Sequence, residues 1–242
     1  MSPLTRRRWR EALVAAAFGL ATGMRPELTR AQDGAGLVPG PWMQSVRLEV
    51  LLSRRLLLVL AGADTLYRAR IAVPSGRTLT MAGRTWHFTL PRGERRVTGK
   101  RERPVWIPPE WHYAEIARAE GLRVAPFPLA GVTLHDGSRL TVRDSVIGVV
   151  PPGDTTFLAL PTEEHVIFEG TVFIPPMETL NRRVDGMLGA YALDLGGGYM
   201  IHGTRDLTSI GRAVTHGCIR LGDRDLAWVY ARVPVGTPVL VR

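Results

Sequence analysis

The residues with the clearest chemical potential lie near the C-terminus, in the stretch YMIHGTRDLTSIGRAVTHGCIRL. It holds the protein's only cysteine, Cys218, which directly follows His216 and a glycine. A second His-Gly pair begins at His202, sixteen positions before the cysteine. Acyl transfer by a cysteine needs a base or cation that promotes the thiolate, and donors for the developing oxyanion. The spacing therefore predicts a Cys/His nucleophile pair.

The local pattern indicates how the chain would build such a site. Gly217 permits a close backbone approach, so the N–H groups of Gly217 and Cys218 can converge on an acyl oxygen. The stretch YMIHGT is typical of a strand end, which would present His202 to the same place. The polar segment 204–215 is long enough to fold back between them.

Two other kinds of site are weighed against this one. His202, His216 and Cys218 have side chains that zinc prefers, but the glycine-bearing turn favours acyl transfer without metal. The remaining histidines are dispersed and show no metal-ligand spacing; they are His87, His112, His135 and His165. Adjacent carboxylates at Glu163 and Glu164 would point to opposite faces of a strand, so a solvated turn is expected there.

The first residues predict export. Four arginines within residues 6–10 precede an apolar stretch of 13 residues, 12–24, which is shorter than a membrane span. A basic start, a short apolar run and small residues up to Ala31 are typical of a secretory signal peptide, and Arg6-Arg7 also fits the twin-arginine type. We therefore expect a signal peptide over 1–31, a linker over 32–45, a periplasmic or cell-envelope location, and no membrane span once the signal is removed.

Composition limits what the exported part can be. About 210 residues remain after residue 31, and 45% of the whole chain is apolar, enough for one large core. The net charge of +9 includes +4 in residues 1–31, so the remainder is only mildly basic. Its densest basic cluster, GERRVTGKRERP at 93–104, is expected to be a solvated loop, and no nucleic-acid-binding motif accompanies it. A single cysteine in an exported protein has no partner in its own chain. Cys218 is therefore expected to be buried, to take part in a reaction, or to form a disulfide with another chain.

Hydrophobic alternation predicts a mostly β protein with a few helices. Short strands are expected at 46–52, 55–62, 66–74, 85–90, 139–142, 146–150, 165–169, 191–195, 199–202 and 237–241. One helix is expected in PEWHYAEIARAEG, ending at Gly121, and another in DRDLAWVYARV, with Asp223 as its N-cap. Five tryptophans, at 42, 86, 106, 111 and 228, are expected in the core or at a groove edge.

These residues carry a family resemblance. The sequence IHGT…IGRAVTHGCIRL resembles the motif of the YkuD-type L,D-transpeptidases, with fourteen positions between His202 and His216 and with Thr215 to Arg220 matching the second half. The flanking stretches LGAYALDLGGGYMIHGT, DLAWVYARVPVGTPVLVR and VRLEVLLSRRLLLVL resemble the neighbouring parts of that domain. The resemblance implies an L,D-transpeptidase-like β-sandwich or barrel over 46–242. Residues of about 124–177 depart from it and are predicted to be an insertion with strands of its own.

The resemblance implies a peptidoglycan enzyme that serves cell-wall organisation and cell shape without metal or cofactor. Cys218 would form a thioester with a tetrapeptide stem and pass the acyl group to an amine. His202 would act as base, oriented by the Gly203 carbonyl, while Gly217 and Cys218 supply the oxyanion N–H groups. Thr215, His216 and Arg220 would shape the substrate site. A structural role stays open for two of them. His216 would then be a structural histidine with its hydrogen bonds satisfied inside the protein, and Arg220 would form a salt bridge with Asp206 or Asp223.

Other functions stay open beside the transpeptidase. A hydrolytic L,D-carboxypeptidase would pass the same thioester to water, and a non-catalytic wall-binding or partner-binding protein would keep only the fold.

Overall fold

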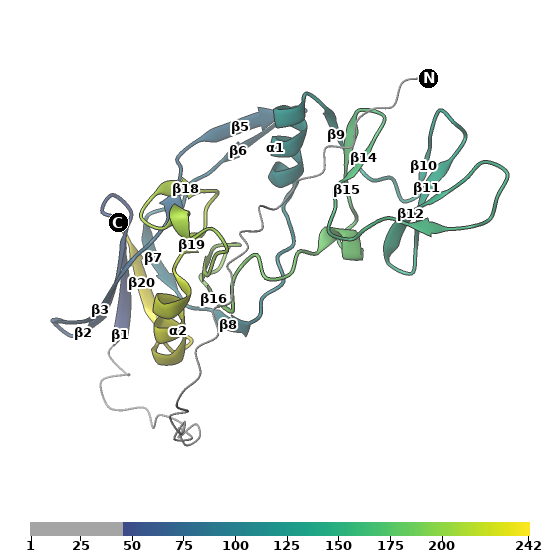
Figure 1. Ribbon diagram of the computed structural model, residues 1–242. Coiled ribbons are helices and arrows are strands. Elements are labelled where there is room, and N and C mark those ends of the chain that lie inside the picture. The colour runs from purple at the N-terminus through teal and green to yellow at the C-terminus, as the bar shows by residue number, and fades with distance from the viewer. Residues whose placement is uncertain (1–45) are drawn as a thin grey trace, which may run out of the picture. The chain divides into compact units, whose positions relative to one another are not determined.

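The computed structural model describes residues 46–242, so the predicted signal peptide (1–31) and linker (32–45) lie outside the described residues. This part of the chain folds into short strands and two α-helices, which confirms the predicted mostly β class (Figure 1). Between residues 46 and 242 no helix is long and apolar enough to cross a membrane.

The first sheet joins the two ends of the described chain. Its strand order is β3-β2-β1-β20-β7, comprising β1 (Val46–Leu51), β2 (Leu56–Ala61), β3 (Asp64–Arg70), β20 (Pro238–Val241) and β7 (Gly93–Arg96). β1 and β2 correspond to the strands predicted at 46–52 and 55–62 and form a hairpin, and β20 lies parallel to β1 (Figure 1). Leu48, Val50 and Leu57 are completely buried, so this sheet supplies one side of the main core.

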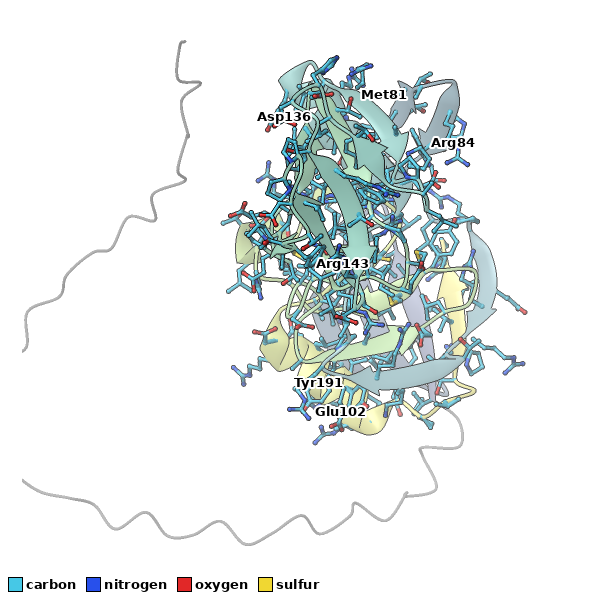
Figure 2. All side chains as sticks on the ribbon, turned by 90° about the vertical axis from the view of Figure 1, so that its right-hand side faces the viewer. Met81, Arg84, Glu102, Asp136, Arg143 and Tyr191 are labelled. Atoms are coloured by element: carbon cyan, nitrogen blue, oxygen red, sulfur yellow. The ribbon has the colours of Figure 1, made fainter. Side chains whose placement is uncertain are left out.

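The second sheet carries the motif residues. Its order is β19-β17-β16-β8, comprising β8 (Gly99–Glu102), β16 (Tyr191–Asp194), β17 (Met200–His202) and β19 (Ile219–Arg220). Tyr191 and Glu102 are register partners in β16 and β8, and Figure 2 shows them close together. Ile201, Ile219 and Leu226 of helix α2 (Asp223–Arg232) belong to the same buried cluster as Leu48. Both sheets therefore share one hydrophobic core.

The basic cluster at 93–104 is not a loop, contrary to expectation. It forms β7, which pairs with β20, and β8, which pairs with β16. Both are the last strands of their sheets, where one edge and much of the side-chain surface face solvent. Charged side chains are tolerated on such edges because the backbone alone makes the ladder. The cluster therefore links the two sheets.

Both predicted helices are present, with one difference at a cap. Helix α1 spans Glu110–Glu120 and ends at Gly121, which has φ 66° as a left-handed C-terminal residue requires. Helix α2 has Gly222, not Asp223, at its N-cap, so the predicted cap is wrong by one residue. Asp223 instead lies in the first turn, where a negative charge is favourable next to the helix dipole.

Helix α1 is packed on two sides. One side contacts the hairpin of β5 (Thr78–Met81) and β6 (Arg84–His87), where Leu79 and Phe88 pack with Ala114. Figure 2 shows Met81 and Arg84 together at the tip of this hairpin. On the other side, Tyr113 and Ala117 pack against Val172. The short strands β4 (Val73–Pro74) and β18 (Ala213–Thr215) pair in parallel. This pairing joins the chain just before the β5–β6 hairpin to the chain just before Cys218.

The segment of about 124–177 has strands and a core of its own. One sheet contains β14 (Val166–Phe168), β15 (Thr171–Ile174) and β9 (Arg123–Pro126). The other contains β10 (Val132–Thr133), β11 (Arg139–Arg143), β12 (Val146–Val150) and β13 (Leu158–Ala159). Phe127, Leu140, Ile147 and Phe173 form a separate buried cluster between them. Its status as an insertion into a smaller domain stays a prediction. Two 3₁₀ turns, Leu180–Arg182 and Leu207–Ser209, complete the elements.

Candidate active site

Two adjacent strands bring His202 and Cys218 to one place. His202 is the last residue of β17, and Cys218 directly precedes β19. The two strands are parallel, with Ile201 opposite Ile219 and His202 opposite Arg220. Both candidate residues line a cavity of about 570 Å³. Residues separated by sixteen positions thus face a common space.

The imidazole of His202 is buried and held in one tautomer. Its Nδ1 lies 2.6 Å from the carbonyl oxygen of Gly203, and 6% of the residue is exposed. A carbonyl oxygen only accepts, so Nδ1 carries the hydrogen and Nε2 is left as an acceptor. Burial lowers the pKa of His202 to about 4; the bond to Gly203 opposes this shift, and the charge of Arg220 adds to it. The side chain is therefore neutral at pH 7.

A close backbone crossing fixes the position of Gly203. Its N–H donates to the carbonyl of Leu188 over 2.8 Å. A Cβ added at Gly203 would lie 2.9 Å from the Cα of Gly189, and one added at Gly189 would lie 2.7 Å from the Cα of Gly203. Real side chains do not make such contacts, so both positions require glycine. The close contact of Gly189 with Gly203 therefore fixes the position of the Gly203 carbonyl group, which accepts the hydrogen bond from His202.

The thiol of Cys218 is also neutral at pH 7. Burial raises its pKa, while the backbone of Met200 and the charge of Arg220 act in the opposite direction. Its Sγ lies 4.0 Å from the carbonyl oxygen of Gly198. With the pKa of His202 lowered and that of Cys218 raised, the two rest as imidazole and thiol and not as an ion pair.

The turn before Cys218 is tight. Gly217 has φ 150°, and a Cβ there would lie 3.3 Å from the ring of Tyr199. The hydroxyl of Thr215, a buried residue, donates to the carbonyl of Cys218 over 2.5 Å. Within residues 46–242 the N–H groups of Gly217 and Cys218 donate to no other protein group. Two free donors thus lie beside the thiol.

His216 is engaged by helix α1. Its Nε2 lies 2.9 and 3.0 Å from the two carboxylate oxygens of Glu115. The ring stacks on Trp111 with centroids 3.9 Å apart and an interplanar angle of 11°, and it meets Phe88 edge-on at 4.4 Å. Glu115 and Trp111 were not predicted as site residues. No local pattern pairs them with a histidine about a hundred positions away.

Arg220 lines the cavity without the ion pair considered for it. Over residues 46–242 it forms no salt bridge, so the expected pairing with Asp206 or Asp223 is absent from the structure. Asp206 instead caps the turn at Leu207–Ser209 by accepting from the N–H and hydroxyl of Thr208. The guanidinium of Arg220 therefore stays available to a ligand.

The cavity is lined by both apolar and charged side chains. Its apolar lining residues include Val105, Trp106 and Ile107, and its charged ones are Arg101, Glu115, Arg205, Asp206 and Arg220. Arg101 is already paired with Asp194.

Two histidines predicted to be dispersed are in contact. His112 of α1 and His165 before β14 have their Nε2 atoms 3.1 Å apart, and His112 lines the main cavity. Burial lowers the pKa of His112 to about 4. In the part of the chain that the structure describes, no group of three or more His, Cys, Asp or Glu side chains has the geometry of a metal site.

Comparisons with known proteins agree with the motif. A family model described as "L,D-transpeptidase catalytic domain" (YkuD) matches residues 45–241. The probable L,D-transpeptidase YbiS of Escherichia coli is 47% identical over 55 residues, 23% of this chain and 18% of that protein. The putative L,D-transpeptidase YkuD of Bacillus subtilis is 44% identical over 61 residues, 25% of this chain and 37% of that protein. The matched stretches thus span well under half of each relative.

Among solved structures, L,D-transpeptidase 3 from Mycobacterium tuberculosis with a faropenem-derived adduct is similar. It has a TM-score of 0.43 and 14% sequence identity, and the match covers 82% of this chain and 60% of that chain.

The buried imidazole makes the fold sensitive to acid. The pKa of His202 is about 4 in the folded protein and near 6.5 when unfolded, so the unfolded chain binds the proton more readily. The free energy of unfolding should be unaffected by this group above pH 6.5 and fall by roughly 3 kcal/mol as the pH decreases to 4. Urea denaturation across this range measures the slope. His202→Gln should reduce it, whereas His87→Gln, at an exposed histidine, should not; equal slopes in all three proteins would contradict the assignment.

Proposed function

This chain belongs to the L,D-transpeptidase catalytic domain family, and from that premise we propose that it is a cysteine-dependent acyltransferase acting on peptidoglycan stem peptides. The observation that carries the proposal is the convergence of Cys218 and a tautomerically fixed His202 in one cavity. The relatives are matched over a fraction of their length, so the proposal depends on this chain's own site.

In the proposed acylation, Nε2 of His202 takes the proton of the Cys218 thiol as Sγ attacks a carbonyl carbon. That carbon belongs to the third residue of a tetrapeptide stem. The bond to the terminal D-alanine then breaks, and the imidazolium returns the proton to the departing amine. A thioester on Cys218 remains. The neutral resting pair suits this sequence because a base must be unprotonated and the thiol must be activated only in the transition state.

The free N–H groups of Gly217 and Cys218 would stabilise the tetrahedral oxyanion. They lie at a turn that glycine makes possible and are not occupied by other protein acceptors among the described residues. Preorganised backbone donors of this kind typically contribute a hundredfold or more to the rate. Arg220, with no ion pair of its own in residues 46–242, would hold a carboxylate of the substrate.

The second half of the reaction defines the product. We propose that an amine, such as the side chain of a neighbouring diaminopimelate, attacks the thioester carbonyl and regenerates the thiol. With water as acceptor the same thioester would make the protein an L,D-carboxypeptidase. The amine is the proposed acceptor because the cavity of Cys218 is lined in part by Val105, Trp106 and Ile107, and apolar lining residues suit a peptide acceptor.

The active thiol can be tested by covalent capture. Wild-type protein incubated with a carbapenem should gain one adduct mass, located on Cys218 by peptide mass spectrometry. Cys218→Ala should gain none and should keep its fold, because the change removes a single small side chain. With a disaccharide-tetrapeptide, wild type should release D-alanine and form either a cross-linked or a hydrolysed product. An unmodified wild-type protein would favour the non-catalytic binding alternative.

The roles of the two motif histidines can be separated. His202→Ala should slow acylation by the tetrapeptide about a hundredfold, the scale expected for losing a positioned base. Iodoacetamide alkylation above the thiol pKa should be nearly unchanged in this variant, because the thiolate forms there without a base. His216→Ala should lose less acylation, since its imidazole faces Glu115. A larger loss in His216→Ala than in His202→Ala would reverse the assignment.

We also propose that residues 1–31 direct export, which would bring the site to the cell wall. A reporter fused after residue 35 should leave the cytoplasm. Arg6→Lys/Arg7→Lys should block this if the twin-arginine route is used and leave it intact if the general route is used. A cytoplasmic reporter from the unmutated fusion would contradict export.

A further inference from the structure

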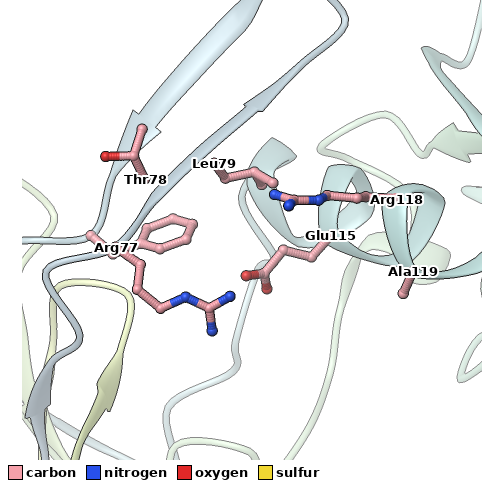
Figure 3. A pocket seen from close by; sticks show the side chains of 7 residues that line it. Arg77, Thr78, Leu79, Glu115, Arg118 and Ala119 are labelled. Carbon is pink, nitrogen blue, oxygen red and sulfur yellow. The ribbon is translucent and has the colours of Figure 1, made fainter.

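A second, smaller cavity lies between strand β5 and helix α1. Its volume is about 290 Å³, and of its lining residues only Glu115 is shared with the cavity of Cys218 (Figure 3). The wall between the two cavities is the contact of Glu115 and Phe88 with His216. The smaller cavity is thus a neighbour of the proposed active site but separate from it.

The charged side chains that line the smaller cavity favour an anionic ligand. Figure 3 shows the side chains of Arg77 and Arg118 directed toward the space that the carboxylate of Glu115 also faces. Within residues 46–242 neither guanidinium forms a salt bridge, although a carboxylate is nearby. Both oxygens of Glu115 are already within hydrogen-bond distance of His216. Two arginines therefore face the cavity without a carboxylate partner.

The uncharged lining indicates what accompanies the anion. Leu79 and Phe88, which are almost completely buried, and the exposed Ala119 are the apolar residues that line the smaller cavity. A volume near the lower limit for ligand pockets suits a small ligand. The lining matches a carboxylate attached to a carbon that bears a small apolar side chain.

We propose that this cavity binds the free C-terminal carboxylate of a peptide that ends in alanine. Arg77 and Arg118 hold the two carboxylate oxygens, and Leu79, Phe88 and Ala119 contact the methyl group. The peptidic source of the carboxylate rests on the proposed function, since peptidoglycan stems end in this way. A second stem can then be held beside the one that acylates Cys218.

Titration calorimetry on the full chain tests the site with three probes: N-acetyl-D-alanine, its C-terminal amide and inorganic phosphate. The acid should bind, and Arg77→Ala and Arg118→Ala should each weaken it about tenfold or more, the scale of one lost charge-assisted hydrogen bond. Arg68→Ala, which removes an exposed arginine of β3 outside the cavity, should leave the affinity unchanged. Both cavity arginines are exposed, so their removal does not open the core.

Four outcomes would overturn the assignment. Binding of the amide as tight as that of the acid would exclude a carboxylate site, and equal binding of phosphate would make it a general oxyanion site. Unchanged affinity in both cavity variants would exclude Arg77 and Arg118. Loss in Arg220→Ala alone would place the ligand in the Cys218 cavity. The carbapenem adduct on Cys218, measured in the same variants, reports separately on the proposed function and should persist in Arg77→Ala and Arg118→Ala.

Discussion

The parallel pairing of β17 with β19 is the constraint on which the site depends. It places His202, the last residue of β17, near Cys218, the residue directly before β19. The pairing is anchored by Ile201 and Ile219, which are opposite each other and completely buried in the main core. β1 and β20, the first and last described strands, pair in parallel and contribute to the same core. They therefore help to hold Ile201 and Ile219 in place. A shift of one residue in either strand would turn the site residues to the other face.

Burial decides the chemical state of the pair. It lowers the pKa of His202 and raises that of Cys218, so neither carries a charge at pH 7. The thiolate is the form of cysteine that oxidants attack. A cysteine that rests as the neutral thiol is therefore less reactive toward oxidants than a thiolate would be. The same desolvation gives the acid sensitivity of the fold, since a proton on His202 costs more in the folded protein than in the unfolded chain.

Local sequence patterns predicted those parts of the structure that local physics determines. The strands β1 and β2, the two helices and the strand that ends at His202 were predicted from hydrophobic patterns and flanking turn residues such as Gly121. The basic stretch at 93–104 was misjudged because its charged side chains say nothing about backbone pairing with β20 and β16. Glu115 and the contact of His112 with His165 were missed for another reason. Both join residues from α1 to distant segments, and only the tertiary packing of that helix brings them together.

Helix α1 connects the remaining parts of the molecule. One side packs on the β5–β6 hairpin, and the other on the sheet of β9 and β15 within the 124–177 segment. From this position Trp111 and Glu115 hold His216, which is two residues from Cys218. Movement of the helix against either neighbour would therefore change the turn that carries the thiol and its N–H donors. Because Glu115 also faces the arginine-lined cavity, an anion bound there would act on the same carboxylate that holds His216. The helix thus gives the 124–177 segment and the smaller cavity a physical route to the reacting centre.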